Sequence, residues 1–252
     1  MTKIKISAVS YTNTFPFIYG LENSSIFNHI ELSKDIPSVC AQKLLENKVD
    51  VGLIPVAVIP KLKHHEIISD YCIGASGPVR SVILASFKPL HEIETIYLDY
   101  HSRSSVMLTR ILAKHFWKIN VKWTDTTDGF ENRLKQNEAA VIIGDKALIA
   151  ENNFPFVYDL AKEWINSTKL PFIFAAWVTN KNLGDTFKEE FNKALKFGLT
   201  NIDLMIEKTD FTFLPSDVNP KEYLTKNIDF NLDKNKIKGL NLFLDYAGEF
   251  QL

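Results

Sequence analysis

The chain has 252 residues and a formal net charge of −1, with 46% hydrophobic and 23% charged residues. These values are typical of a folded globular protein of one large domain or two lobes, and the lack of a concentrated basic face excludes nucleic acid as a partner. No apolar run reaches the ~20 residues that span a bilayer, and no apolar signal core precedes the first predicted strand, so we expect a cytoplasmic protein without a membrane partner.

Short apolar strands alternate with helical stretches along the chain. The first set of patterns predicts a strand at 4–9, a helix at 14–21, a strand at 29–34, a helix at 37–47, and strands at 49–55, 71–75 and 81–87. The second set predicts a strand at 95–99, helix 104–117, strand 121–124, helix 130–137, strand 139–143, helix 159–168 and strand 172–179. Helices at 185–208, 220–227 and 233–249 follow. This order predicts an α/β fold with mainly parallel sheets.

Two apolar strands, at 81–87 and 172–179, bracket the middle of the chain. We expect them to be the crossing points between two lobes, one formed by residues 1–87 and 178–252 and the other by residues 88–177. No Gly/Ser-rich linker separates the parts, so the pattern favours a two-strand hinge over a flexible tether. A ligand cleft is expected between the lobes.

Polar loops follow or precede several predicted strand ends, where open α/β sheets bind their ligands. Residues 10–14, 76–81, 101–105 and 144–145 are rich in hydroxyl and amide groups. In a closed two-lobed protein these four loops can face one cleft.

The loop at 101–105 is the clearest anion site in the sequence. Ser102, Ser104 and Ser105 stand at a predicted helix start, where free backbone amides and the helix dipole favour an anion. Arg103 can add a forked contact to a carboxylate. The alternative is ordinary helix capping with Arg103 in solvent.

The other polar loops leave similar alternatives open. Asn13 and Thr14 follow the first strand and can orient a substrate group or form a simple Asx turn. Ser81 can face the cleft or cap a strand. Asp145, after Gly144, can be a general base or a lone carboxylate at a turn.

The sequence carries no familiar metal or cofactor motif. The six histidines form no HExxH pair, and His64 and His65 are adjacent residues that point apart, as on a protein surface. GxGxxG, the phosphate-binding GxxxxGK[ST] and GxSxG are all absent. Cys40 and Cys72 lie in apolar stretches and are expected to be buried free thiols. We therefore expect neither a metal nor a cofactor.

Taken together, these loops resemble the chorismate dehydratase family of the futalosine route to menaquinone. The similar segments are Val9-Ser10-Tyr11-Thr12-Asn13-Thr14-x-Pro16, Asp35–Ser38, Asp50–Pro55, Gly77–Val82, Ser102–Ser105, Gly144–Leu148 and Leu170–Trp177. They cover nearly the whole chain in the family's order. Thr12 departs from the pattern, which has leucine there, and Val56-Ala57 lacks the polar residues usual after Pro55.

The resemblance implies a two-lobed fold like that of type 2 periplasmic binding proteins, and the dehydration of chorismate to 3-[(1-carboxyvinyl)oxy]benzoate. By the same resemblance, Asn13 and Ser81 are the catalytic candidates. The substrate-binding candidates are Tyr11, Thr14, Ser38, Ser102, Arg103, Ser104, Ser105, Gly144 and Asp145.

The base that removes the ring proton stays open between the substrate's own enolpyruvyl carboxylate, Asp145 and His101. Rival functions are the 1,4-dihydroxy-6-naphthoate synthase of the same pathway and a non-catalytic protein that binds a small carboxylate. A transcriptional effector domain also uses this fold, but no DNA-binding segment is attached. The sequence carries no signal for the oligomeric state.

Overall fold

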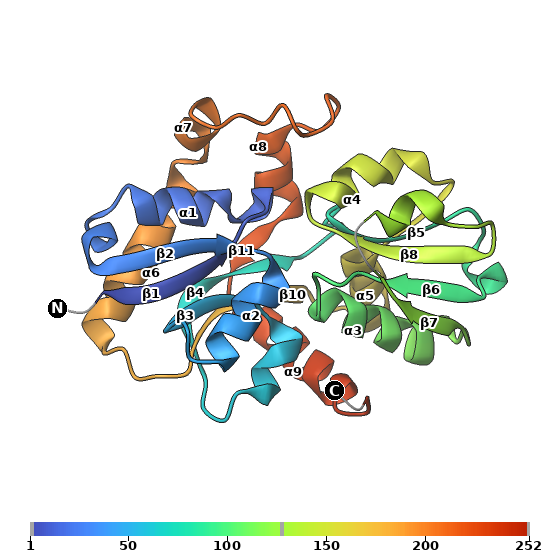
Figure 1. Cartoon of the computed structure of the whole chain (residues 1–252), viewed down its shortest axis with the longest axis horizontal. Coiled ribbons are helices and arrows are strands. Elements are labelled where there is room, and N and C mark those ends of the chain that lie inside the picture. The colour runs from blue at the N-terminus through green and yellow to red at the C-terminus, as the bar shows by residue number, and fades with distance from the viewer. Residues whose placement is uncertain (1–2, 127–128, 251–252) are drawn as a thin grey trace.

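Two mixed β-sheets, each flanked by helices, form two lobes in the computed structural model, which describes residues 3–126 and 129–250 (Figure 1). The first sheet has the order β11-β4-β10-β3-β1-β2. Its strands are β1 (Ile4–Val9), β2 (Ile30–Asp35), β3 (Val51–Pro55), β4 (Glu66–Ala75), β10 (Phe172–Thr179) and β11 (Asp229–Asn231). β1 pairs in parallel with β2 and β3, whereas β10 runs antiparallel between β3 and β4.

The second sheet has the order β7-β6-β8-β5-β9. Its strands are β5 (Val82–Ser86), β6 (Thr95–Leu98), β7 (Lys122–Asp125), β8 (Glu138–Ile143) and β9 (Phe156–Asp159). β6 pairs in parallel with β7 and β8, and β5 runs antiparallel to β8 and β9. Each sheet therefore has parallel pairs interrupted by an antiparallel strand, which corrects the expectation of mainly parallel sheets.

Helices cover the sheets and connect the strands. They are α1 (Phe15–Glu22), α2 (Pro37–Leu45), α3 (Ser104–Ile111) with a π-helical end at Leu112–Trp117, α4 (Asp145–Ala150), α5 (Leu160–Thr168), α6 (Asp185–Thr200), α7 (Ile202–Glu207), α8 (Pro220–Glu222) with a π-helical turn at Tyr223–Asn227, and α9 (Lys234–Ala247). Short 3-10 helices lie at Thr12–Thr14, Ser25–His29, Val56–Lys61, Leu90–Glu92, Phe130–Arg133 and Glu151–Asn153.

The chain passes between the sheets through residues 76–81 and 169–171, not through the two strands expected from the sequence. β5 belongs to the second sheet and β10 to the first, so each lies in the lobe opposite to its expected one. The crossing segments start from neighbouring strands, since Ala75 at the end of β4 pairs with Phe172 at the start of β10. Two side-by-side connections outside the strands therefore join the lobes.

Several elements differ from their sequence patterns for local reasons. The helix expected at 130–137 is a 3-10 helix at Phe130–Arg133 that follows Gly129, whose φ is 76°. The helix expected at 185–208 is broken at Asn201, where the backbone leaves helical angles. The strands β9 and β11 were not expected, because three- and four-residue edge strands depend on pairing and carry little periodicity of their own.

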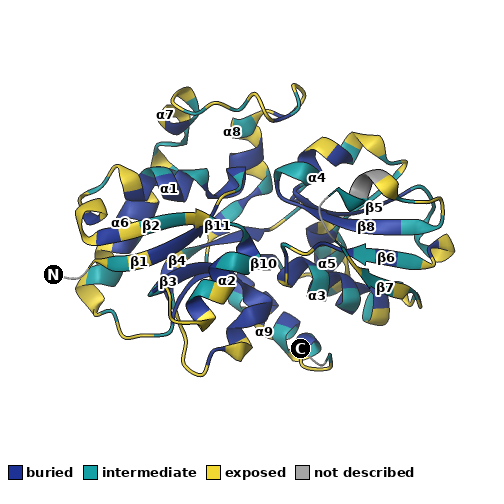
Figure 2. Cartoon of the chain, in the orientation of Figure 1, coloured by how far each residue is buried: buried dark blue, intermediate teal, exposed yellow. Residues whose placement is uncertain are grey.

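The core of the first lobe holds α1 and its preceding loop in place. The Phe17 ring packs on Trp177 of β10, and Trp177 packs on Phe191 of α6 (ring centroids 5.9 and 5.1 Å apart). α1 and α6 touch at their backbones, because a Cβ on Gly198 would lie 1.8 Å from the Pro16 carbonyl oxygen. Figure 2 shows that both sheets are largely buried between their helices.

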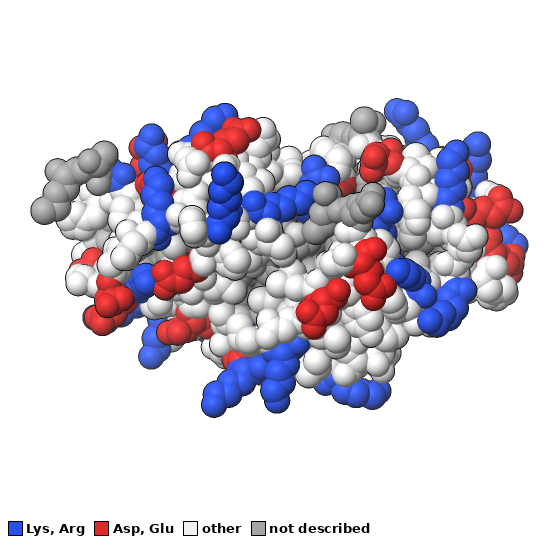
Figure 3. All heavy atoms as spheres, turned by 90° about the horizontal axis from the view of Figure 1, so that it is seen from below, with Lys and Arg blue, Asp and Glu red and all other residues white. Residues whose placement is uncertain are grey.

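The expectations for the two cysteines and for His64 and His65 agree with the structure. Within residues 3–126 and 129–250, no helix has the length and apolar character needed to traverse a lipid bilayer. Cys40 and Cys72 are buried and unpaired, and His64 and His65 are exposed. Charged side chains of both signs are interspersed on the face shown in Figure 3, in keeping with the near-zero net charge.

Candidate ligand site between the lobes

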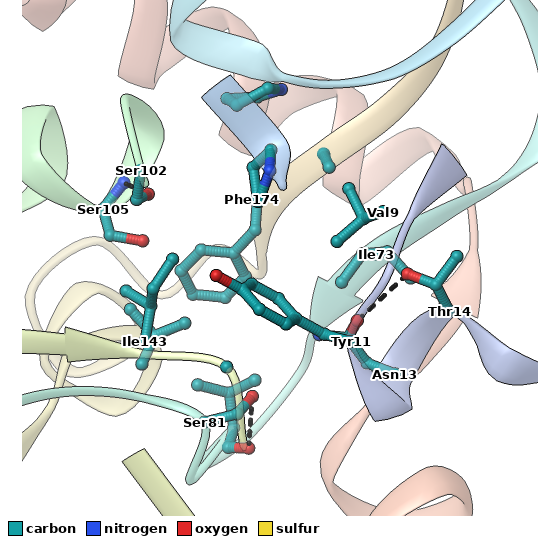
Figure 4. Close-up of a pocket in the computed structure, with 16 residues that line it drawn as sticks. Val9, Tyr11, Asn13, Thr14, Ile73, Ser81, Ser102, Ser105, Ile143 and Phe174 are labelled. Carbon is teal, nitrogen blue, oxygen red and sulfur yellow. Dashed lines mark hydrogen bonds between the residues drawn. The ribbon is translucent and has the colours of Figure 1, made fainter. Parts of the chain in front are cut away.

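A pocket lies where the two sheets meet, and it encloses about 500 Å³ of space not filled by protein atoms, including its opening to solvent. The residues that line it are Val9, Tyr11, Asn13, Thr14, Pro37, Pro55, Ile73, Val79, Ser81, Val82, Ser102, Ser105, Ile143, Gly144, Phe174 and Ala175 (Figure 4). Its walls are mainly apolar, and its polar groups come from segments far apart in the sequence.

The loop after β1 supplies the first group of polar side chains. Its backbone turns into the 3-10 helix Thr12–Thr14 and then into α1, with Pro16 in the first helical turn. Asn13 is 9% exposed, and its Oδ1 accepts a hydrogen bond from the Thr14 hydroxyl at 3.2 Å. The Asn13 amide NH₂ therefore remains as a donor for a ligand.

The start of α3 supplies the second group, from the other lobe. Ser102 Oγ accepts from the Ser105 backbone N–H at 3.0 Å, which is the helix capping expected from the sequence. Both side chains are buried and line the pocket. The positive end of the α3 dipole thus lies at the pocket wall, and such an end favours a negatively charged ligand group.

Ser81 lies at the end of a crossing segment, immediately before β5. It is fully buried, and its hydroxyl has a 3.5 Å contact to the Val79 carbonyl oxygen. Its own carbonyl accepts from the Gly144 N–H at 2.8 Å, which ties the crossing segment to the end of β8. The Ser81 hydroxyl is therefore held at the pocket by backbone contacts and is only weakly used within the protein.

Tyr11 reaches from the first lobe to the second. Figure 4 shows its ring extending between Asn13 on one side and the two α3 serines on the other. Its hydroxyl lies 2.9 Å from His101 Nδ1. Burial raises the pKa of the Tyr11 phenol, and the nearby Asp99 and Asp145 carboxylates raise it further. The phenol therefore stays protonated at neutral pH and can donate a hydrogen bond.

Two of the expected site residues, Asp145 and Ser104, lie outside the pocket lining because they join the lobes. The Asp145 carboxylate accepts from the Thr12 backbone N–H, at 3.2 and 3.4 Å to its two oxygens. The Ser104 hydroxyl donates to the Phe174 carbonyl at 2.8 Å and accepts from the Ala57 N–H at 3.3 Å. Burial raises the pKa of Asp145, with the Thr12 contact opposing the rise.

Arg103 and Ser38 also lie outside the pocket lining, in a neighbouring groove between α2 and α3. Arg103 is exposed, as in the alternative of capping without a ligand contact. The helical repeat is the reason: Ser102 and Ser105 turn one side of the α3 start toward the pocket, and Arg103 lies on the other side. At the start of α2, Pro37 likewise lines the pocket and Ser38 lines the neighbouring groove.

The described residues that line the pocket include no aspartate, glutamate, histidine, lysine or arginine. Tyr11 is the ionisable side chain among them. Elsewhere in the described part of the chain, no three His, Cys, Asp or Glu side chains gather as metal ligands would. The pocket can thus hold a polar ligand through hydroxyl, amide and helix-end groups.

Sequence reasoning missed the apolar walls and one polar neighbour of the site. The walls include Ile73 of β4 and Phe174 of β10, which the sequence pattern presents as ordinary strand residues. The polar neighbour is Tyr223, whose buried ring belongs to the π-helical turn Tyr223–Asn227. No local motif distinguishes this tyrosine from a core residue.

The fold and the placement of the pocket define a two-lobed α/β protein with a pocket between the lobes, and known structures share this architecture. Protein AF1704 from Archaeoglobus fulgidus is similar over 98% of both chains, with a TM-score of 0.75 and 13% identity. The alkanesulfonate-binding protein SsuA from Xanthomonas axonopodis pv. citri, bound to MOPS, matches 98% of this chain and 93% of its own (TM-score 0.66, 11% identity). The Candida albicans CA3427 gene product, described as having the generic periplasmic binding protein fold, covers 100% and 92% (TM-score 0.65, 15% identity).

These likenesses show the periplasmic-binding-protein fold expected from the sequence. The sequence itself shows the family, because a family model described as menaquinone biosynthesis matches residues 4–249. The chain belongs to this menaquinone biosynthesis family.

Proposed function

We propose that this protein is a chorismate dehydratase that converts chorismate to 3-[(1-carboxyvinyl)oxy]benzoate and water. The observation that carries the proposal is the pocket itself, in a chain of the menaquinone biosynthesis family. Its polar groups are an amide and hydroxyls from both lobes, and its described lining residues supply no carboxylate or imidazole. Such a site suits a substrate that carries its own charges and its own base.

The reaction needs little from the protein beyond positioning. Removal of the proton at the ether-bearing ring carbon sends negative charge toward the conjugated ring carboxylate. Loss of the neighbouring hydroxyl then makes the ring aromatic, and that hydroxyl leaves as water after gaining a proton. The product is strongly favoured, so a protein that holds the flexible dianion in one pose and stabilises the spreading charge can supply most of the acceleration.

Three parts of the pocket have distinct roles in this proposal. The hydroxyls of Ser102 and Ser105, together with the α3 dipole, bind one carboxylate. The Asn13 amide and the Ser81 hydroxyl orient the leaving hydroxyl and the enolpyruvyl side chain. Tyr11 covers the ligand between them as a neutral donor.

The enolpyruvyl carboxylate of the substrate is the base that this site favours. Asp145 is outside the pocket lining and accepts from the Thr12 N–H. His101 is also outside it, with its Nδ1 near the Tyr11 hydroxyl. A carboxylate that is part of the bound substrate can reach the ring proton without a protein base.

The test is to incubate the purified protein with chorismate, follow ring aromatisation in the ultraviolet, and identify the product by mass spectrometry as chorismate minus water. Turnover supports the proposal. Chorismate that stays intact contradicts it and leaves two rivals, the 1,4-dihydroxy-6-naphthoate synthase and the non-catalytic carboxylate-binding protein. Calorimetry separates these two: chorismate that binds without reacting indicates the binding protein. The fold shared with SsuA favours the binding protein as the second candidate function, because SsuA is an alkanesulfonate-binding protein.

Asn13→Ala should abolish most turnover while the protein stays folded. The substitution removes the amide that orients the substrate, and misplacement of this kind costs about 10²-fold in rate. The checks are kcat for chorismate and the circular dichroism spectrum. Unchanged chorismate consumption by a folded variant would remove Asn13 from the site.

A further inference from the structure

Tyr223 has a buried hydroxyl whose hydrogen bonding the fold leaves incomplete. Its side chain is 1% exposed, and within the part of the chain that the structure describes its Oη makes no hydrogen bond of good geometry, although the Ser81 and Asn13 side chains lie close enough for weaker polar contacts. Burying a hydroxyl in this way destabilises a protein, so such groups are rare. A poorly satisfied hydroxyl beside a ligand pocket points to hydrogen bonds that form fully only when a ligand is bound.

The polar side chains beside this hydroxyl are Ser81 and Asn13. Both line the pocket, and both use little of their hydrogen-bonding capacity within the protein. Ser81 has a 3.5 Å contact to the Val79 carbonyl besides its contact to Tyr223, and Asn13 accepts from Thr14 through Oδ1. Three polar groups from distant segments thus meet at one edge of the pocket.

The position of Tyr223 is set by contacts at both ends of its helix. Asn219 caps the start, its Oδ1 accepting from the Glu222 N–H at 3.0 Å. At the other end, the Asn227 amide donates to the Pro78 carbonyl in the crossing segment at 2.9 Å. The tyrosine is therefore fixed to the segment that carries Ser81. Burial raises the pKa of its phenol, which stays protonated and able to donate.

We propose that Tyr223 is a positioning residue of this site, whose hydroxyl hydrogen-bonds with Ser81 and Asn13 when a ligand engages them and fixes their orientation on the ligand. The ligand is the substrate of the proposed function, and this part of the inference rests on that function. Tyr223 itself is outside the pocket lining, so it acts through its two neighbours.

The first experiment measures the Tm of ligand-free Tyr223→Phe, with Tyr158→Phe as the matched control. The Tyr158 hydroxyl accepts from the Leu90 N–H at 3.2 Å, on an edge strand away from the pocket. Tyr158→Phe should therefore lower the Tm. Tyr223→Phe should leave the Tm unchanged or raise it, because the lost hydroxyl makes no well-formed hydrogen bond in the free protein. A Tm as low as that of the control would overturn the inference, since the hydroxyl would then be structural.

The second experiment measures kcat and KM with chorismate. Tyr223→Phe should lower kcat about tenfold, the value of one hydrogen bond, with a smaller change in KM. Tyr158→Phe should leave both constants unchanged. In a Ser81→Ala background, Tyr223→Phe should lower kcat by clearly less than tenfold, because one of its two neighbours is already lost.

Unchanged kcat and KM in Tyr223→Phe would also overturn the inference. A wild-type protein that leaves chorismate intact contradicts the proposed function instead. In that case the Tm comparison, which needs no ligand, still tests whether the Tyr223 hydroxyl stabilises the fold.

Discussion

Gly144 adopts a φ of 64° and a ψ of −149°, a conformation that residues with a side chain rarely adopt. A Cβ at this position would also lie 2.9 Å from ring carbons of Tyr11, which belongs to the other lobe. The glycine therefore serves two purposes: it ends β8 beside the pocket, and it lets the aromatic ring approach the second lobe closely.

Gly144→Ala should weaken both closure and folding. The added methyl group strains the backbone and displaces Tyr11, at a cost of about 1–3 kcal/mol in unfolding free energy. Chorismate affinity should fall about tenfold or more. Calorimetry and urea denaturation measure the two effects. Gly77→Ala is a suitable control, because a Cβ there meets no atom within 4 Å and its φ is not positive.

The substitution Asp145→Asn tests whether Asp145 acts as a contact between the lobes or as a general base. The asparagine oxygen can still accept from the Thr12 N–H, so the joint between the lobes should persist. We expect kcat for chorismate to stay within about threefold of wild type, whereas removal of a general base costs ~10²–10⁴-fold. A loss in that larger range would assign the base to Asp145 and contradict the substrate-assisted route.

Asp35, at the end of β2, connects β1, β2 and α2 behind the loop that carries Tyr11 and Asn13. Asp35 Oδ2 lies 2.6 Å from Lys43 Nζ of α2 and accepts from the Ser7 and Ser33 hydroxyls, each at 2.7 Å. The Asp35 carbonyl accepts from the Ser10 N–H at 2.9 Å, at the start of the loop that carries Tyr11 and Asn13. Burial alone would raise the pKa of Asp35, but the Lys43 and serine contacts hold it below its ordinary value.

Asp35→Asn should lower the stability at pH 7 and have less effect in acid. A carboxylate with a depressed pKa stabilises the fold above its unfolded pKa of about 3.9, and that contribution is lost as the pH falls through the folded pKa. We expect a loss of about 1–3 kcal/mol at pH 7. Thermal unfolding at pH 7 and pH 3 tests this.

The exposed Asp70 supplies a control for that measurement. Asp70→Asn should change the Tm little at either pH. An Asp35→Asn deficit that is as large at pH 3 as at pH 7 would show that the stabilisation does not depend on the charge.

Across the whole molecule, a few contacts join the lobes next to the ligand site. Ser104 makes one of the buried contacts: it starts a helix of the second lobe and bonds to the Phe174 carbonyl and the Ala57 N–H of the first. The C-terminal end adds a second joint, where Glu249 lies 2.8 Å from Lys114 and 3.1 Å from His115 at the end of the α3 region. Figure 1 shows this end of the chain beneath the junction of the lobes.

Ser104→Ala should destabilise the protein by about 1–3 kcal/mol, because two buried backbone groups lose a partner. The unfolding free energy from urea denaturation is the measurement. Ser167→Ala, at an exposed position of α5, should cost far less. Equal effects of the two substitutions would mean that the Ser104 joint contributes nothing to stability.

Much of this protein is readable from its sequence. The bounds of β1 and β10 match their apolar patterns, and the family resemblance is confirmed by the family match over residues 4–249. Loops 10–14, 76–81, 101–105 and 144–145 all contribute to one pocket, as expected if strand ends and crossing segments meet between two lobes. The catalytic and binding roles of their residues stay predictions.

The remaining features depend on tertiary structure. An apolar strand such as β5 or β10 pairs equally well in either sheet by its sequence alone, so the lobe boundary follows from the partners that it finds. Ser102 faces the pocket and the adjacent Arg103 faces the groove only because α3 packs against the rest of the protein in this orientation.

Local patterns thus determined the elements, the polar loops and the family, because periodicity and turn chemistry act over a few residues. The tertiary structure alone decided that Asp145 and Ser104 join the lobes and that Tyr223 stands beside Asn13 and Ser81. Burial and hydrogen-bond geometry arise from contacts between residues 47 to 133 positions apart, and no local pattern encodes them.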